Sequence, residues 1–222
     1  MWPKTLSILA SASLLVFSSV APQAAEHVFT VRVQNVSVAN LLKLSNGKTA
    51  SVTPGAVLLS STPTEDRCSL PVSRAAARVS RPWPKMDRLP PLGRSRPLRS
   101  GEAFEFKVSG KPGEWLTIAT MLGQSNDLFY SPREEGIALF DATGQPIAGD
   151  ITSQILLWDA GTEINEEPGL GPNQPAFQAA PNTGPDEHGV VRPISEVKDG
   201  FHYQTVAEVL RVTITVGPTA ML

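Results

Sequence analysis

A period-two alternation of apolar and polar residues is the feature that most constrains this chain. Phe29, Val31 and Val33 alternate with polar side chains, and the same pattern returns over residues 104–108 and 210–216. Side chains of a strand point to its two faces in turn, so this alternation predicts strands with one buried face.

Shorter apolar runs lie between these segments and are bounded by turn residues. They occupy residues 115–121, 136–140 and 155–158. No long helical period follows the first 25 residues. Short strands at this spacing are typical of antiparallel sheets, and we therefore predict an all-β fold, an antiparallel β-sandwich of about eight strands.

Residues 1–25 have the pattern of a secretory signal peptide. Lys4 supplies the positive charge, an apolar run follows over residues 6–20, and the small residues Ala24 and Ala25 stand near the expected cleavage point. The run is shorter than the roughly 20 residues of a membrane helix, which favours cleavage over a signal anchor. We expect a secreted or periplasmic chain with one domain over residues 26–222 and no transmembrane segment after cleavage.

Charge and cysteine content exclude some classes of protein. The formal net charge of the 222 residues is -2, which gives no electrostatic reason to expect a nucleic-acid partner. Cys68 is the single cysteine, so no internal disulfide can form and the hydrophobic core must hold the domain together.

Residues 57–100 differ from the rest of the chain. They are rich in Arg, Pro and Ser, contain nine basic residues and lack phenylalanine. One explanation is a disordered basic linker. The other is that the gene is read out of frame here, because a shifted reading of residues 82–87 permits Leu-Ala-Glu-Asp-Gly and one of residues 58–69 permits an apolar strand. Both explanations stay open.

Two short motifs place carboxylates at the ends of apolar runs: Ser-Asn-Asp ending at Asp127, and Trp-Asp-Ala-Gly-Thr-Glu containing Asp159 and Glu163. Calcium prefers six to eight oxygen ligands in a flexible arrangement, which loops at strand ends supply well. Gly161 allows the chain to turn, so that Asp159 and Glu163 can converge. The alternative is that each carboxylate only caps a turn, which is our interpretation of Asp141 and Asp150.

Four stretches carry a resemblance to a known family: GEAFEF, MLGQSNDLFY, GIALFDATGQPIAGDIT and LLWDAGTEINEEPGLGPNQ. Together they resemble the spondin amino-terminal domain, found in bacterial proteins and in the F-spondin and mindin module. The resemblance implies a sandwich similar to calcium-dependent phospholipid-binding domains, an adhesion function, and Ca²⁺ ligands at Asp127, Asp159 and Glu163. Animal members often have Asp at the last of these positions.

The aromatic residues near the motifs differ in the positions that we expect for them. We expect Trp115 and Trp158 to be core residues, whereas Phe129 and Tyr130 either lie buried or form an exposed tip that contacts a partner or a membrane. The Pro-, Gly- and Asn-rich stretch 165–199 predicts a long loop, and loops of that length are usually functional or mobile.

Catalytic patterns are weak. His27, His188 and His202 lie in unrelated contexts, and Ser125 lacks a nucleophile-elbow pattern. We therefore predict a non-enzymatic calcium-binding recognition or adhesion module whose extracellular or envelope ligand is a protein, a glycan or a lipid. The alternatives are a metal-dependent envelope enzyme and a calcium-triggered lipid-binding module.

Overall fold

The computed structural model describes residues 25–38, 52–60, 97–180 and 182–219, with only the backbone described for 52–60 and 219. The predicted signal peptide therefore lies almost entirely outside the described residues, as do residues 61–96 of the Arg-, Pro- and Ser-rich segment. Residues 57–60 of that segment belong to a strand.

In the described residues, ten strands form two antiparallel sheets. The first sheet has the order β3-β1-β10-β7, with β1 at His27–Asn35, β3 at Ala103–Gly110, β7 at Gly149–Asp150 and β10 at Leu210–Thr219. The second has the order β2-β4-β5-β8-β9, with β2 at Val52–Ser60, β4 at Trp115–Leu122, β5 at Leu128–Pro132, β8 at Ile155–Asp159, β9 at Arg192–Pro193, and β6 at Ile137–Ala138 paired to β4.

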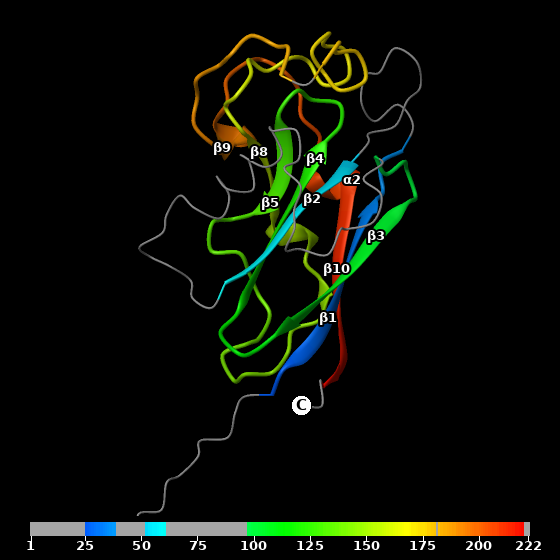
Figure 1. The fold of residues 1–222 in the computed structure, drawn as a ribbon, viewed down its shortest axis with the longest axis vertical. Helices are drawn as coiled ribbons and strands as arrows, with labels where there is room; N and C mark the ends of the chain where they lie inside the picture. Colours follow the sequence, from blue (N-terminus) through cyan, green and yellow to red (C-terminus); the bar gives the residue numbers. More distant parts are fainter. Residues whose placement is uncertain (1–24, 39–51, 61–96, 181, 220–222) are drawn as a thin grey trace, which may run out of the picture.

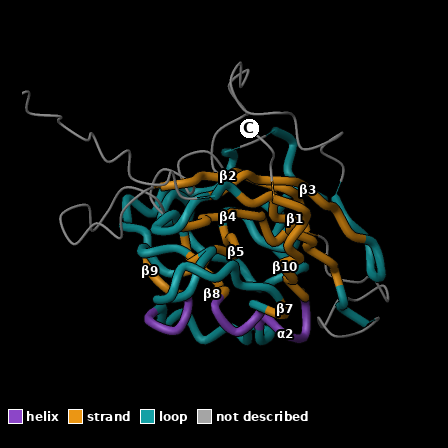
Figure 2. Tube along the Cα trace, turned by 90° about the horizontal axis from the view of Figure 1, so that it is seen from below, coloured by secondary structure: helices purple, strands orange, loops and turns teal. Residues whose placement is uncertain are grey.

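The two sheets pack face to face, as the two layers of strands in Figure 2 show. One cluster of buried side chains draws on both sheets, with Phe29, Val31 and Ile214 from the first and Leu116 and Leu157 from the second. The alternation read from the sequence is the cause, because every second residue of β1 and of β10 points into this cluster. The predicted all-β sandwich is confirmed, and three of its ten strands are only two residues long.

The second sheet is buried on its outer face as well. Ala119, Phe129, Trp158 and Ala160 form a smaller cluster there, with Leu156 and Val191 packed against it. The indole N–H of Trp158 donates to the Ser131 carbonyl at 3.0 Å, so its one polar atom is satisfied. This cluster packs the chain just before β9 against β8.

Helical structure in the described residues is limited to short segments, which are η1 at Thr152–Gln154, η2 at Ile194–Glu196 and α2 at Val206–Val209. None of the helices described is long and apolar enough to cross a membrane.

The structural interpretation of two aspartates is confirmed, although only Asp141 lies in a turn and Asp150 ends strand β7. Asp141 Oδ1 accepts hydrogen bonds from the backbone N–H of Thr143 and Gln145 at 2.8 and 2.9 Å. Asp150 Oδ1 accepts one from the Thr152 N–H at 2.8 Å. Both carboxylates fix the backbone that follows them, a turn after Asp141 and the start of η1 after Asp150.

The segment between β8 and β9 forms one end of the molecule, drawn in yellow to orange at the top of Figure 1. β10 finishes near the opposite end, where β1 begins. The segment that follows Asp159 therefore lies at the end of the molecule farthest from the start of β1.

Candidate metal centre

Strand register brings two of the predicted ligands together. Asp159 is the last residue of β8 and stands opposite Leu128, the first residue of β5. Asp127 immediately precedes β5, so the two aspartates are neighbours at the same edge of the sheet. On its other side Asp159 pairs with Arg192 of β9.

A returning loop adds a third carboxylate. Residues 161–164 run antiparallel to residues 185–189, with the Gly189 N–H donating to the Gly161 carbonyl at 2.8 Å and the Glu187 N–H to the Thr162 carbonyl at 3.1 Å. This pairing carries the Glu187 side chain back over the aspartates.

Gly161 makes the close approach possible. Its φ is +65°, in the left-handed region, and a Cβ atom added to it would lie 2.8 Å from backbone atoms of Gly189 and Val190. The turn expected at Gly161 is therefore present, and its consequence is the approach of the Glu187 segment.

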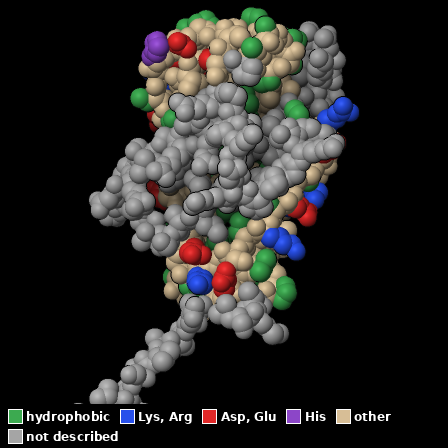
Figure 3. All heavy atoms as spheres, viewed as in Figure 1, with side chains coloured by type: hydrophobic (Ala, Val, Ile, Leu, Met, Phe, Trp, Pro, Cys, Tyr) green, Lys and Arg blue, Asp and Glu red, His purple; other side chains and the backbone are tan. Residues whose placement is uncertain are grey.

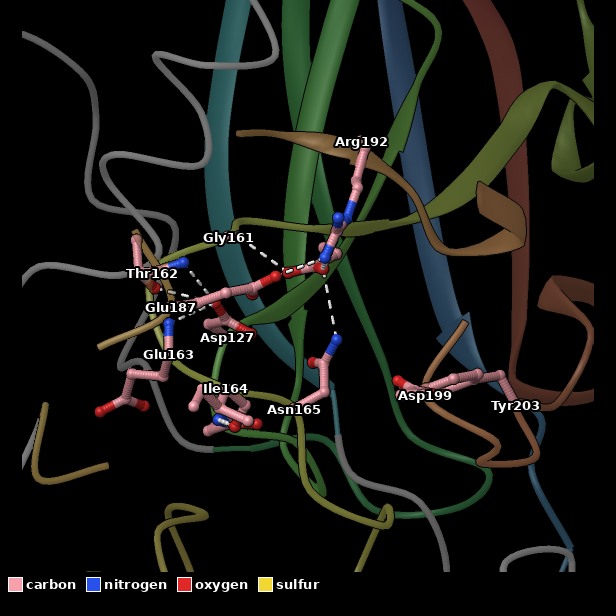
Figure 4. Close-up of polar contacts among 12 residues, drawn as sticks. Asp127, Gly161, Thr162, Glu163, Ile164, Asn165, Glu187, Arg192, Asp199 and Tyr203 are labelled. Atoms are coloured by element: carbon pink, nitrogen blue, oxygen red, sulfur yellow. Dashed lines mark hydrogen bonds and ion pairs between the residues drawn. The ribbon is translucent and has the colours of Figure 1, made fainter. Parts of the chain in front are cut away.

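Asp127, Asp159 and Glu187 form a group in which one carboxylate oxygen from each residue lies within 4.8 Å of the others. Asp127 and Asp159 are 1% and 0% exposed, while Glu187 is partly buried. Figure 4 shows the side chains of Asp127 and Glu187 meeting in the centre of the site, with Arg192 reaching in from the opposite side.

The two carboxylate oxygens of Asp127 differ in the hydrogen bonds that they accept. Its Oδ2 accepts hydrogen bonds from the Thr162 N–H at 2.9 Å, the Thr162 hydroxyl at 2.8 Å and the Glu163 N–H at 3.1 Å. Its Oδ1 is buried and accepts none from any described residue. Burial of a carboxylate oxygen without a hydrogen bond costs free energy. A bound cation or a hydrogen-bond donor at Oδ1 would lower this cost.

Asp159 differs from Asp127, because both of its carboxylate oxygens accept hydrogen bonds. Asp159 Oδ1 accepts the Gly161 N–H at 2.7 Å, and Oδ2 accepts Asn165 Nδ2 at 3.2 Å and two N–H groups of Arg192 at 3.2 and 3.1 Å. Arg192 also forms an ion pair with Glu187 Oε1. Glu187 Oε2 and Asn165 Oδ1 are buried without a hydrogen-bond partner in the described part of the chain.

The electrostatics of the group favour a positive charge. Burial raises the pKa of Asp127 above its ordinary value, and the charge of Asp159 adds to the increase against the hydrogen bonds from Glu163 and Thr162. Burial and then Asp159 likewise raise the pKa of Glu187, with Arg192 opposing them. Both carboxyls are therefore harder to ionise in the absence of a bound cation.

The third predicted ligand, Glu163, lies outside this group. Its carboxylate accepts the Gly184 N–H at 2.8 Å and points away from Asp127 in Figure 4. Glu163 contributes to the site through its backbone N–H instead, which donates to Asp127. Glu187, which the sequence did not indicate, lies beside the two aspartates where Glu163 was expected.

Phe129 and Tyr130 are 0% and 1% exposed, so the interpretation of an exposed aromatic tip is wrong. They lie on β5, which is buried along its whole length. Trp158 is buried at 6% exposure, in agreement with its expected place in the core, and Trp115 is half-buried.

No family model matches the chain, and no curated protein matches it either. The resemblance to the spondin domain therefore stays a prediction, and the site must be interpreted from its own geometry.

The donor set fits a hard cation. Asp127, Asp159 and Glu187 supply carboxylate oxygens, and the unpaired amide oxygen of Asn165 is near them, since its amide nitrogen bonds Asp159. No histidine or cysteine belongs to the group. Oxygen-only sites on loops suit calcium or magnesium better than softer metals. A metal ion can bind here, and an open groove of about 380 Å³ adjoins it, with Asn165, Glu187 and Arg192 in its wall.

Proposed function

We propose that the chain is an exported, calcium-binding recognition or adhesion module of the spondin type, without enzymatic activity. One observation carries the proposal: in a group of three close carboxylates, Asp127 Oδ1 and Glu187 Oε2 are buried and unpaired. Hydrogen bonds from Thr162 and Glu163 fix Asp127 in position, so its free oxygen is held ready for a ligand that carries positive charge.

Calcium is the cation that suits this site best. The candidate ligands come from a strand end and two loop segments, and such a support adapts to the six to eight oxygens that calcium takes. Magnesium demands a near-ideal octahedron and keeps most of its water, so it gains less from a site of this kind.

Binding rather than catalysis is the proposed consequence of cation binding. The groove beside the carboxylates is open to solvent, and its wall includes Ile164, Glu196 and Lys198 in addition to residues of the site. Neither His188 nor His202 is among the residues that line it. A mixed charged and apolar wall next to a cation suits a protein, glycan or lipid ligand that the cation helps to hold.

Calorimetric titration of the purified mature chain with Ca²⁺, and with Mg²⁺ for comparison, tests the proposal. We expect saturable Ca²⁺ binding that a chelator reverses, and a loss of about 100-fold or more in affinity on Asp127→Asn, which removes the best-ordered charge. Asp141→Asn is the matched control, since Asp141 only shapes an exposed turn. A folded wild-type chain that binds no Ca²⁺ would refute the proposal.

Exposed apolar residues favour calcium-triggered lipid binding as a second candidate. Four large apolar residues of the loop that follows Asp159 are 44–72% exposed, and they are Ile164, Leu170, Phe177 and Val190. Hydrophobic side chains are visible at the upper end of the molecule in Figure 3, the end this loop forms in Figure 1. Large apolar groups in water often mark a contact surface.

Sedimentation with lipid vesicles separates the two candidates. A lipid-binding module sediments with vesicles in Ca²⁺ but not in chelator, and Phe177→Ser weakens this binding while leaving the Ca²⁺ affinity unchanged. Equal amounts of protein in the supernatant with and without Ca²⁺ would remove the lipid candidate and leave the recognition module.

A further inference from the structure

We infer that Arg192 competes with the divalent cation for the carboxylates, and that this competition sets the affinity of the site. The inference rests on the proposed cation binding and adds a residue that determines its strength. The guanidinium group of Arg192 supplies a positive charge to two of the three carboxylates, those of Asp159 and Glu187.

The contacts of Arg192 are those of a tethered counter-ion. Its Nε and Nη2 lie 3.2 and 3.1 Å from Asp159 Oδ2, and Nη2 also pairs with Glu187 Oε1. One side chain thus bridges two of the three members of the acidic group. Cross-strand pairing of Asp159 with Arg192 holds the two backbones side by side, so the side chain reaches the carboxylates without any movement of β9.

Asp159 shows why the two cations exclude each other. Both of its oxygens already accept hydrogen bonds, Oδ1 from the Gly161 N–H and Oδ2 from Asn165 and Arg192. A metal ion that coordinates Oδ2 must displace at least one of its three donors, and one that coordinates Oδ1 lies close to the charge of Arg192. Arg192 is the one donor that carries a positive charge, and the metal ion repels it most strongly.

Two buried carboxylate oxygens of the group have no hydrogen-bond donor among the described residues, even though Arg192 contacts two of its members. Asp127 Oδ1 and Glu187 Oε2 have no donor, although Arg192 engages the other oxygen of Glu187. The guanidinium contacts Asp159 and Glu187, and none of its described contacts reaches Asp127. A compact divalent ion can contact all three carboxylates, because its ligands surround it on several sides.

Arg192 has space to withdraw. Its side chain is 32% exposed and lies in the wall of the groove of about 380 Å³. Lys198 lines the same groove but forms none of the described contacts to the three carboxylates. Cation binding should therefore move one positive charge from the acidic group into the groove by rotation of a side chain.

Calorimetry on variants tests the competition. Arg192→Gln keeps a polar side chain of moderate length but removes the charge, and we expect it to bind Ca²⁺ about tenfold more tightly or better than wild type. Lys198→Gln, which removes one positive charge from the same groove, should change the affinity by less than about threefold, because screening weakens an exposed charge. Unchanged or weaker binding by a folded Arg192→Gln would overturn the inference.

NMR of the wild-type chain gives a second measurement that needs no variant. The Nε–H of Arg192 donates to Asp159, so it should exchange slowly with water in chelator and faster when Ca²⁺ is bound, while Arg211 serves as the exposed reference. A Nε–H that stays protected in saturating Ca²⁺ would show that both charges remain and would refute competition. If neither wild type nor Arg192→Gln binds Ca²⁺, the proposed function itself fails.

Discussion

The paired sheets and the loop of residues 160–191 are ordered by different forces. Between the sheets, nineteen buried residues form one apolar cluster. In the loop, the large apolar side chains Ile164 and Phe177 are exposed, while the polar Glu163 and Gln174 are buried. The sheets are held by removal of apolar surface from water, and the loop by hydrogen bonds to buried polar groups.

Gln174 illustrates the second kind of order. Its side chain is 1% exposed, accepts the Gly169 N–H at 2.8 Å and donates to the Glu167 carbonyl at 2.8 Å. Such bonds define a shape but each adds only about 1 kcal/mol to stability. The difference predicts that most of the stability comes from the sheets, whereas the loop mainly shapes the proposed cation site, and four measurements test this contrast.

Leu116→Ala should have the largest effect on stability. Leu116 is 0% exposed on β4 in the centre of the apolar cluster, so its truncation should lower the free energy of unfolding by about 3–4 kcal/mol in urea titrations. Val190→Ala, 72% exposed in the loop, should cost under about 0.5 kcal/mol. Similar costs for the two variants would contradict the division between the regions.

Glu187→Gln and Glu163→Gln compare the two candidate third ligands. Saturation with cation at 100 times its dissociation constant should stabilise the wild-type chain by about 2.7 kcal/mol. We expect Glu187→Gln to remove most of this increment and Glu163→Gln to keep most of it, because the Glu163 carboxylate lies outside the group and bonds Gly184. Thermal melting with and without Ca²⁺ measures both, and the reverse order would restore Glu163 as the ligand.

Gly161→Ala should have a smaller effect, concentrated in the loop. A methyl group there adds a contact of 2.8 Å with the Gly189 and Val190 backbone to the strain of a positive φ, for a total of about 2–3 kcal/mol. Gly113→Ala is the control, because its φ is +89° but nothing lies within 4 Å, so only about 1 kcal/mol of strain is expected. Hydrogen exchange should show faster opening of residues 185–190 in Gly161→Ala alone.

The pH dependence should be the smallest effect. The pKa values of Asp127, Glu163 and Glu187 are raised, each chiefly by burial, so the folded cation-free chain binds more protons than the unfolded chain just above their ordinary values. Stability in chelator should therefore rise slightly as the pH falls from 7 toward 5.

Ca²⁺ should change the sign of this trend, because the cation binds ionised carboxylates and its stabilising increment grows with pH. Below about pH 4 the groups with lowered pKa, such as Asp141 and Asp150, lose their hydrogen-bonded charge, and stability falls with or without cation. A chelated chain that loses stability steadily from pH 7 to 5 would contradict the buried state of the three raised groups. Urea titrations at each pH provide the measurement.

Sequence reasoning predicted what depends on local patterns. Alternation located β1, β3 and β10 because one face of each is buried, and the motifs located Asp127 and Asp159 because strand ends are set by nearby turns. β5 was missed, since all five of its residues are buried and it shows no alternation.

Glu187 was missed for a different reason. Its position depends on pairing between residues 161–164 and 185–189, which are far apart along the chain and share no pattern. Loop composition predicts that such a segment is irregular but not where it returns. Carboxylates that a long loop brings to the group therefore need the structure to be found, whereas carboxylates at strand ends do not.

The pairing of Gly161 with Gly189 has a consequence for the resistance of the protein to proteases. A chain with one cysteine cannot close the loop of residues 160–191 with an internal disulfide, so hydrogen bonds close it and, on our proposal, a cation held between Asp159 and Glu187. Closing a loop of this length restricts the open states that proteases cut. Calcium-poor surroundings would then mark this protein for turnover, and calcium-rich ones would preserve it.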